Sequence, residues 1–121
     1  MRDARVALHA ALTVIMMWLA MLLAWPAGTF ATSISYGVMH RIASEEGWAM
    51  AFSVVASVGV SGLCTASRLL RLFSVLVLAT AHGVVAISFV LSNPAETGTG
   101  TYAVLAVLGY YLAWRRADDG V

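Results

Sequence analysis

The chain has 121 residues, of which 61% are hydrophobic and 11% are charged, and its mean hydropathy is +0.87. A soluble domain is about 45 to 50% apolar and about 25% charged, so this composition excludes an ordinary soluble enzyme and predicts a single domain in lipid. Seven arginines and six acidic residues leave a net charge of +1, which does not indicate a nucleic-acid partner.

The first apolar run covers residues 6–25 and follows two arginines, Arg2 and Arg5. A basic start before an apolar run is also typical of a secretory signal peptide, but the apolar part of such a peptide has only about 7 to 15 residues. This run is longer, and further apolar runs follow it. We therefore expect a retained membrane helix that ends before Pro26, because proline cannot continue a helix.

The connection that follows, residues 26–47, is the longest segment outside the apolar runs. Ile34, Val38 and Ile42 recur every four residues within it, and Met39 lies beside them. This spacing places apolar side chains on one helical face, so we predict a short helix within residues 32–43 that lies in the outer membrane interface. The pattern leaves a plain extended loop open as the alternative.

Three more apolar runs cover residues 48–67, 72–91 and 99–114. A helix needs about 20 mainly apolar residues to cross a membrane, and the last run is shorter than the others. Ser44, followed by two glutamates, gives the second helix an N-cap and acidic residues in its first turn. We therefore predict an all-α, polytopic membrane protein with four transmembrane helices in one domain.

Six of the seven arginines fall on one side of this arrangement, and Arg41 alone falls on the other. The six are Arg2, Arg5, Arg68, Arg71, Arg115 and Arg116. Positive charge marks the cytoplasmic side of a membrane protein, so we expect both termini to be cytoplasmic. At that interface we expect five side chains to anchor the protein among lipid headgroups: Arg68, Arg71, Trp114, Arg115 and Arg116.

The second apolar run carries the most regular pattern in the sequence, in which small residues recur every four positions. The repeat consists of Ala49, Ser53, Ser57, Ser61 and Thr65, and two glycines, Gly59 and Gly62, flank it. Small residues at this spacing let membrane helices approach closely, and hydroxyls add hydrogen bonds across the contact. The stripe predicts either packing within this chain, or a surface that faces another copy or lines a wet path once copies assemble.

Polar residues inside the predicted spans give little sign of chemistry. Every Asp, Glu and Arg falls at or outside a predicted boundary, which argues against an ion-coupled transporter. His9 lies one turn into the first helix and His82 near the middle of the third, and these depths do not match the two axial ligands of a haem. His82 is either hydrogen-bonded inside the helix bundle or an ionisable group that titrates in a pore.

The sequence contains no recognisable catalytic motif. It has a single cysteine, Cys64. It lacks a G-x-S-x-G elbow, an H-E-x-x-H pair and a phosphate-binding glycine loop, and one cysteine is too few for a zinc or iron–sulfur site. We therefore expect a non-enzymatic protein with no metal and no cofactor. A haem or redox subunit that uses His82 is a distant alternative.

Four short stretches stand out along the chain: the basic start, YGVM at 36–39 before EEGW at 45–48, RLLR at 68–71 and WRRADD at 114–119. Together they resemble the small four-span membrane proteins encoded by tailed bacteriophages. The resemblance covers most of the chain through short motifs, and the group has no agreed activity to transfer to particular residues. It implies a viral protein in the bacterial inner membrane. Some such proteins are holins, which accumulate there and permeabilise it, and others block superinfection.

These observations together predict a protein that associates with itself in the lipid bilayer and has a holin-like, permeabilising role. Two features differ from most holins, because the charged C-terminal tail is short and four spans are more than usual. The alternative is a superinfection-exclusion protein or an accessory subunit of a larger membrane complex. In that case another membrane protein would be the partner, and the segment from residue 31 to residue 48 would recognise it.

Overall fold

The computed structural model describes residues 2–25, 36–93 and 97–118, and every regular element in these ranges is a helix. The elements are α1 (Arg2–Ala24), α3 (Gly37–Ile42), α4 (Glu45–Cys64), α5 (Arg68–Ser92) and α6 (Thr97–Asp118). The prediction of an all-α protein is therefore confirmed.

Three of these helices are long and apolar enough to cross a membrane, within the described residues: Ala4–Ala24, Glu45–Cys64 and Arg68–Ser92. They match the first three predicted spans and indicate a membrane protein. Helix α6 is long enough but does not reach the same hydropathy. Its first turns alternate threonine with glycine, and its last turn carries Arg115, Arg116 and Asp118.

Serine caps set the starts of α4 and α5. The Ser44 side chain accepts a hydrogen bond from the Gly47 amide at 3.1 Å, and the Ser67 side chain accepts one from the Leu70 amide at 3.3 Å. The second span was predicted to run to residue 67, but α4 ends at Cys64. The prediction was wrong by three residues because Thr65 is already extended and Ser67 belongs to the cap of the next helix.

The short helix α3 lies within the range predicted for it, although residues 26–35, including Ile34, are outside the described part of the chain. Its buried residue is Met39, whereas Ile42 is 67% exposed. The indole of Trp48 donates a hydrogen bond to the Met39 carbonyl at 2.7 Å, and the Val38 amide donates one to Ser92 Oγ at 2.9 Å. These bonds fix α3 between the start of α4 and the end of α5, with Met39 facing the protein and Ile42 facing outwards.

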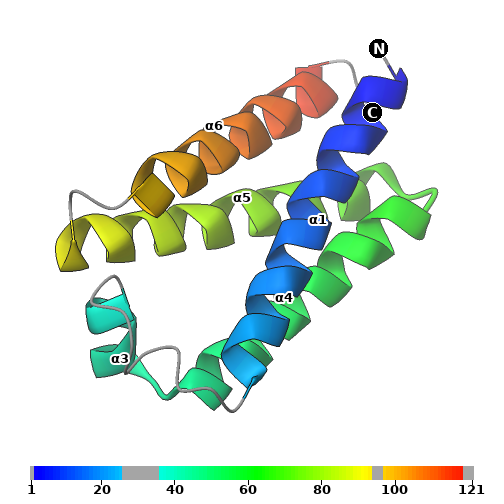
Figure 1. Ribbon diagram of the computed structural model, residues 1–121. Coiled ribbons are helices and arrows are strands. Elements are labelled where there is room, and N and C mark those ends of the chain that lie inside the picture. The colour runs from blue at the N-terminus through cyan, green and yellow to red at the C-terminus, as the bar shows by residue number, and fades with distance from the viewer. Residues whose placement is uncertain (1, 26–35, 94–96, 119–121) are drawn as a thin grey trace.

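The four long helices form two pairs that cross each other (Figure 1). Helix α1 runs along α4, and α5 runs along α6, while α4 also contacts α5. The core lies where the pairs meet and is built from α1, α4 and α5 side chains, among them Leu12, Met16, Leu19, Phe52, Leu78 and Val85. Both ends of the described chain lie at the same end of the molecule.

Helix α6 approaches α5 closely at one glycine. A Cβ atom on Gly109 would lie 2.7 Å from the Cβ atom and 3.1 Å from the backbone Cα atom of Ala79. Backbone atoms cannot move aside as a flexible side chain can, so any larger residue would push the two helices apart. Gly100, on the same helix, has nothing within 4 Å of such an atom.

We expect Gly109→Ala to destabilise the protein by about 1 to 3 kcal/mol through overpacking. Gly100→Ala is the matched control, and it should be neutral or slightly stabilising because alanine is the better helix former. Thermal unfolding in detergent, followed by circular dichroism, measures both. Equal melting temperatures for the two variants would contradict the close α5–α6 contact.

Candidate functional site

Helix α4 presents one face to the protein interior and another to the outside. The inner face consists of Ala49, Phe52, Ala56, Gly59 and Gly62. A Cβ atom on Gly59 would lie 2.6 Å from Thr13 Oγ1, and one on Gly62 would overlap Ser74 Oγ. Three residues of the predicted stripe, Ala49, Gly59 and Gly62, therefore pack within this chain.

The three serines of the stripe lie on the outer face and form a chain of hydrogen bonds along the helix, which we call the serine ladder (Ser53, Ser57 and Ser61). Ser53 Oγ donates to the Ala49 carbonyl at 2.7 Å, Ser57 Oγ to the Ser53 carbonyl at 2.8 Å, and Ser61 Oγ to the Ser57 carbonyl at 2.9 Å. Each hydroxyl hydrogen is thus used within the helix, while the oxygen can still accept a bond.

Thr65 does not continue the ladder, although its spacing predicted that it would. It lies beyond the last helical residue in extended conformation, and its Oγ1 accepts a hydrogen bond from the Ser67 amide at 3.0 Å. A spacing of four places side chains on one face only where the chain is helical, and α4 ends at Cys64, one residue before Thr65.

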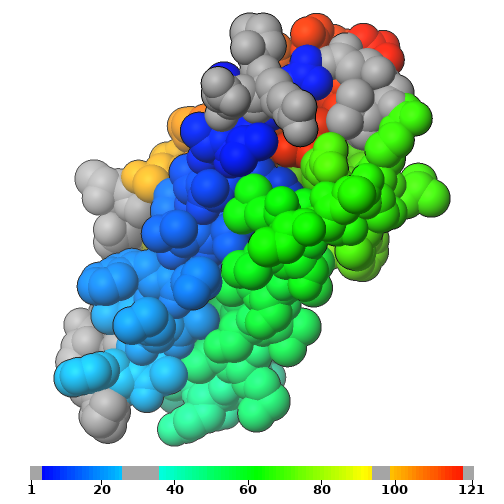
Figure 2. All heavy atoms as spheres, turned by 90° about the vertical axis from the view of Figure 1, so that its right-hand side faces the viewer, coloured from blue at the N-terminus to red at the C-terminus, as the bar shows by residue number. Residues whose placement is uncertain are grey.

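A groove of about 380 Å³ runs beside the ladder, between α1 and α4. Methionine and alanine side chains of α1 form one wall, and α4 supplies Ser53, Ala56, Ser57 and Val60. Figure 2 shows α1 in blue and α4 in green lying side by side on one face of the molecule. Large apolar side chains next to the groove are exposed, including Trp18, Met21 and Val54.

His9 is fully buried on the inner side of α4. Its Nε2 lies 3.1 Å from the Gly59 carbonyl oxygen and 3.3 Å from Ser74 Oγ. A carbonyl oxygen can only accept, and Ser74 already donates its own hydrogen to the Arg71 carbonyl at 2.8 Å, so Nε2 carries the imidazole hydrogen. The other ring nitrogen, Nδ1, is left as an acceptor and has no hydrogen-bond partner in the described part of the chain.

His82 is also fully buried, near the centre of α5. Its Nε2 lies 3.2 Å from the Leu12 carbonyl oxygen, and its ring stacks on Tyr102 at a centroid distance of 5.8 Å. These contacts match the interpretation of His82 as a hydrogen-bonded residue inside the bundle. The structure does not bring the two histidines together. His9 contacts Ser74 of α5, and His82 lies eight residues further along the same helix, a distance of about 12 Å.

Of the expected membrane-interface anchors, Arg68 and Trp114 are exposed, Arg71 and Arg115 are half-buried, and Arg116 is only 3% exposed. Arg116 thus points into the protein. Neighbouring residues on a helix point about 100° apart, so the packing of α6 can bury Arg116 while Arg115 stays half-buried.

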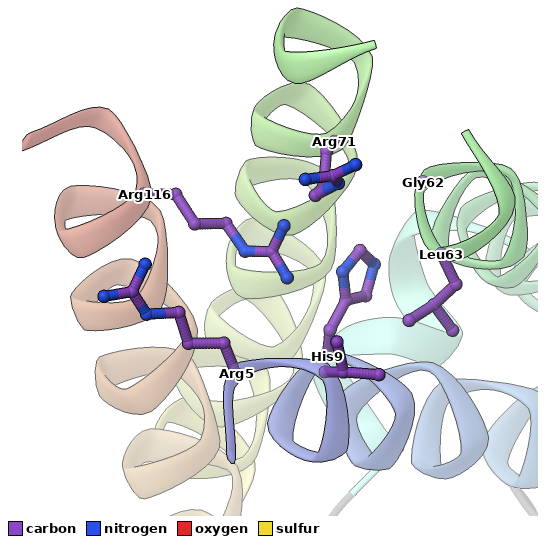
Figure 3. Close-up of a pocket in the computed structure, with 7 residues that line it drawn as sticks. Arg5, His9, Gly62, Leu63, Arg71 and Arg116 are labelled. Carbon is purple, nitrogen blue, oxygen red and sulfur yellow. The ribbon is translucent and has the colours of Figure 1, made fainter. Parts of the chain in front are cut away.

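Arg116 lines a pocket of about 530 Å³ at the end of the molecule where the arginines gather. The other lining residues come from α1, α4 and α5: Arg5, Val6, His9, Gly62, Leu63 and Arg71. In Figure 3 the Arg116 side chain extends from α6 towards the ring of His9, with Arg71 and Arg5 on either side of it. We call this space the arginine pocket. The pocket could not be predicted from the sequence, because its residues come from four helices.

No family model, curated protein or solved structure matches this chain. In the described part of the chain, no group of three or more His, Cys, Asp or Glu side chains is arranged to hold a metal ion. Two candidate sites stand out from the geometry of the described residues. They are the serine ladder with its groove, and the arginine pocket.

A leucine substitution should affect the stability of the protein differently on the two faces of α4. We expect Gly59→Leu to lower stability by about 1 to 3 kcal/mol or more, because a side chain there collides with α1 and α5. Ser57→Leu, two residues away on the outer face, should change stability by no more than about 0.5 kcal/mol. Unfolding of the purified protein in detergent measures both, and a similar loss in the two variants would contradict this assignment of faces.

Proposed function

We propose that the chain is a non-enzymatic protein of the bacterial inner membrane that associates with itself through the serine ladder and permeabilises the membrane in a holin-like way. The observation that carries this proposal is the ladder itself: small residues, exposed on α4 from Ser53 to Ser61, beside a groove lined by α1. The resemblance to phage-encoded membrane proteins agrees with it.

The ladder suits contact between helices in lipid. Lipid tails are as apolar as leucine, so helices associate there through close packing and hydrogen bonds. Serine side chains allow the close approach, and their free lone pairs accept hydrogen bonds from a second chain or from water. When several copies turn their ladders towards one another, the oxygens line a polar path through the assembly.

We further propose that α6 is a fourth span and that both termini are cytoplasmic. The packing of α6 along α5 supports the first point, because a helix paired with a membrane-crossing partner shares its surroundings. The collection of Arg5, Arg71 and Arg116 at one end supports the second, since positive charge marks the cytoplasmic side.

Cysteine cross-linking tests the contact directly. In a Cys64→Ser background, we expect Ser57→Cys to give a covalent dimer on mild oxidation in membranes, because the two ladders face each other. Ile87→Cys is the control, since Ile87 is 62% exposed on a different helix, five residues before the end of α5. Electrophoresis without reducing agent measures the dimer, and equal yields at the two positions would argue against the ladder as the interface.

Inducible expression in a bacterium tests the consequence. We expect the wild type to cause abrupt loss of membrane potential after a delay, and Ser57→Leu to abolish this loss because a large side chain separates the ladders. Ser57→Ala is the matched control and should retain the effect, since alanine is also small. The measurements are a potential-sensitive dye, colony survival and the amount of inserted protein.

Depolarisation by Ser57→Leu at the wild-type rate would remove the proposed assembly. Unaffected growth with normal insertion of the wild type would remove the permeabilising role. It would favour recognition of another protein through residues 31–48.

A further inference from the structure

The arginine pocket lies where four helices meet at one end of the molecule. The first turns of α1 and α5 supply Arg5 and Arg71, the end of α4 supplies Gly62 and Leu63, and the last turn of α6 supplies Arg116. Three guanidinium groups thus line one pocket of about 530 Å³. Like charges gathered this way repel each other, which is a cost to the folded protein. Arg71 also donates a hydrogen bond to the Thr65 carbonyl at 3.0 Å.

Arg116 shows this cost most clearly. Its side chain is 3% exposed, and its Nε atom has no hydrogen-bond partner among the described residues. Burial lowers the pKa of Arg116, and the positive charges of Arg71 and Arg5 lower it further. A buried cation is costly unless an opposite charge or hydrogen-bond acceptors compensate it, and an anion in the pocket would supply that compensation.

The donors in the pocket match a phosphate group. Each guanidinium offers planar pairs of N–H donors that fit phosphate oxygens. Two helix N-terminal ends (α1 and α5) and two C-terminal ends (α4 and α6) meet at the pocket, so the positive potential there comes from the arginine side chains and not from helix dipoles. In Figure 3 one ring nitrogen of His9 is turned towards α4 and the other towards Arg116. The second is Nδ1, an acceptor, which suits a ligand that also carries a hydroxyl.

We propose that the arginine pocket binds a phosphate group through Arg5, Arg71 and Arg116. The phosphate belongs either to the headgroup of an anionic phospholipid or to a soluble phosphate compound. The pocket volume accommodates a glycerophosphate headgroup, and basic pockets between membrane helices bind such headgroups in other proteins. This binding does not depend on self-association through the serine ladder.

Ligand-dependent thermal stability of the whole protein tests the proposal. The protein is purified in an uncharged detergent and titrated at constant ionic strength with phosphatidylglycerol, with inorganic phosphate, and with diacylglycerol, which lacks the phosphate. We expect a saturable rise of Tm with at least one phosphate compound and none with diacylglycerol. Arg116→Gln should weaken the apparent affinity about ten- to a hundredfold, as expected for loss of one charged hydrogen-bonding group.

Arg115→Gln is the matched control, because it removes the neighbouring charge outside the pocket lining and should change the affinity less than twofold. If Arg116→Gln does not fold, Arg5→Gln takes its place, since Arg5 is only half-buried. A rise with phosphatidylglycerol at lower concentration than with inorganic phosphate identifies a lipid site, and the reverse order identifies a soluble ligand.

Two results would overturn the proposal. One is a Tm that rises with neither phosphate compound. The other is an equal loss of affinity in Arg115→Gln and the pocket variants, because binding would then follow total charge and not the pocket.

Discussion

The close approach of α4 to α1 and α5 is the contact on which the rest of the structure depends. At Gly59 and Gly62 the neighbouring side chains occupy the space that a Cβ atom would need. This lets the His9 ring reach the Gly59 carbonyl and lets Ser74 lie against α4. It also sets the opposite face, because residues two positions apart on a helix point about 200° apart. With Gly59 turned inwards, Ser57 and Ser61 must face outwards.

The two candidate sites differ in how their polar groups are satisfied. In the serine ladder every hydroxyl hydrogen is bonded within the helix, so the face tolerates lipid and can still accept hydrogen bonds from a partner. In the arginine pocket Arg71 donates a hydrogen bond to the Thr65 carbonyl at 3.0 Å, whereas the buried Nε of Arg116 has no partner among the described residues. A surface whose donors are satisfied is suited to association with a similar surface, whereas a buried cation is stabilised by a ligand of opposite charge.

The sequence was a good guide to properties that depend on neighbouring residues. Apolar runs of sufficient length predicted three helices that could span a membrane, and Ser44 predicted the start of α4 correctly. It was a poorer guide where one residue could serve either of two elements. Ser67 was predicted to lie inside the second span because the residues up to it are small and uncharged, yet its hydroxyl caps α5. The short helix α3 lies within its predicted range, and only the structure shows that its Met39 side packs against the protein.

By itself, the sequence determined that the chain is helical, that it suits lipid, and that its arginines are segregated, because length, composition and order along the chain suffice for these properties. Only the tertiary structure decided which side of the small-residue stripe packs inwards and which of two adjacent arginines is buried. Those outcomes depend on neighbours remote in sequence: Thr13 and Ser74 select the glycine face of α4, and the ends of α1 and α5 bring Arg5 and Arg71 to Arg116. Periodicity shows that a helix has distinct faces, but the packing of the other helices determines what each face contacts.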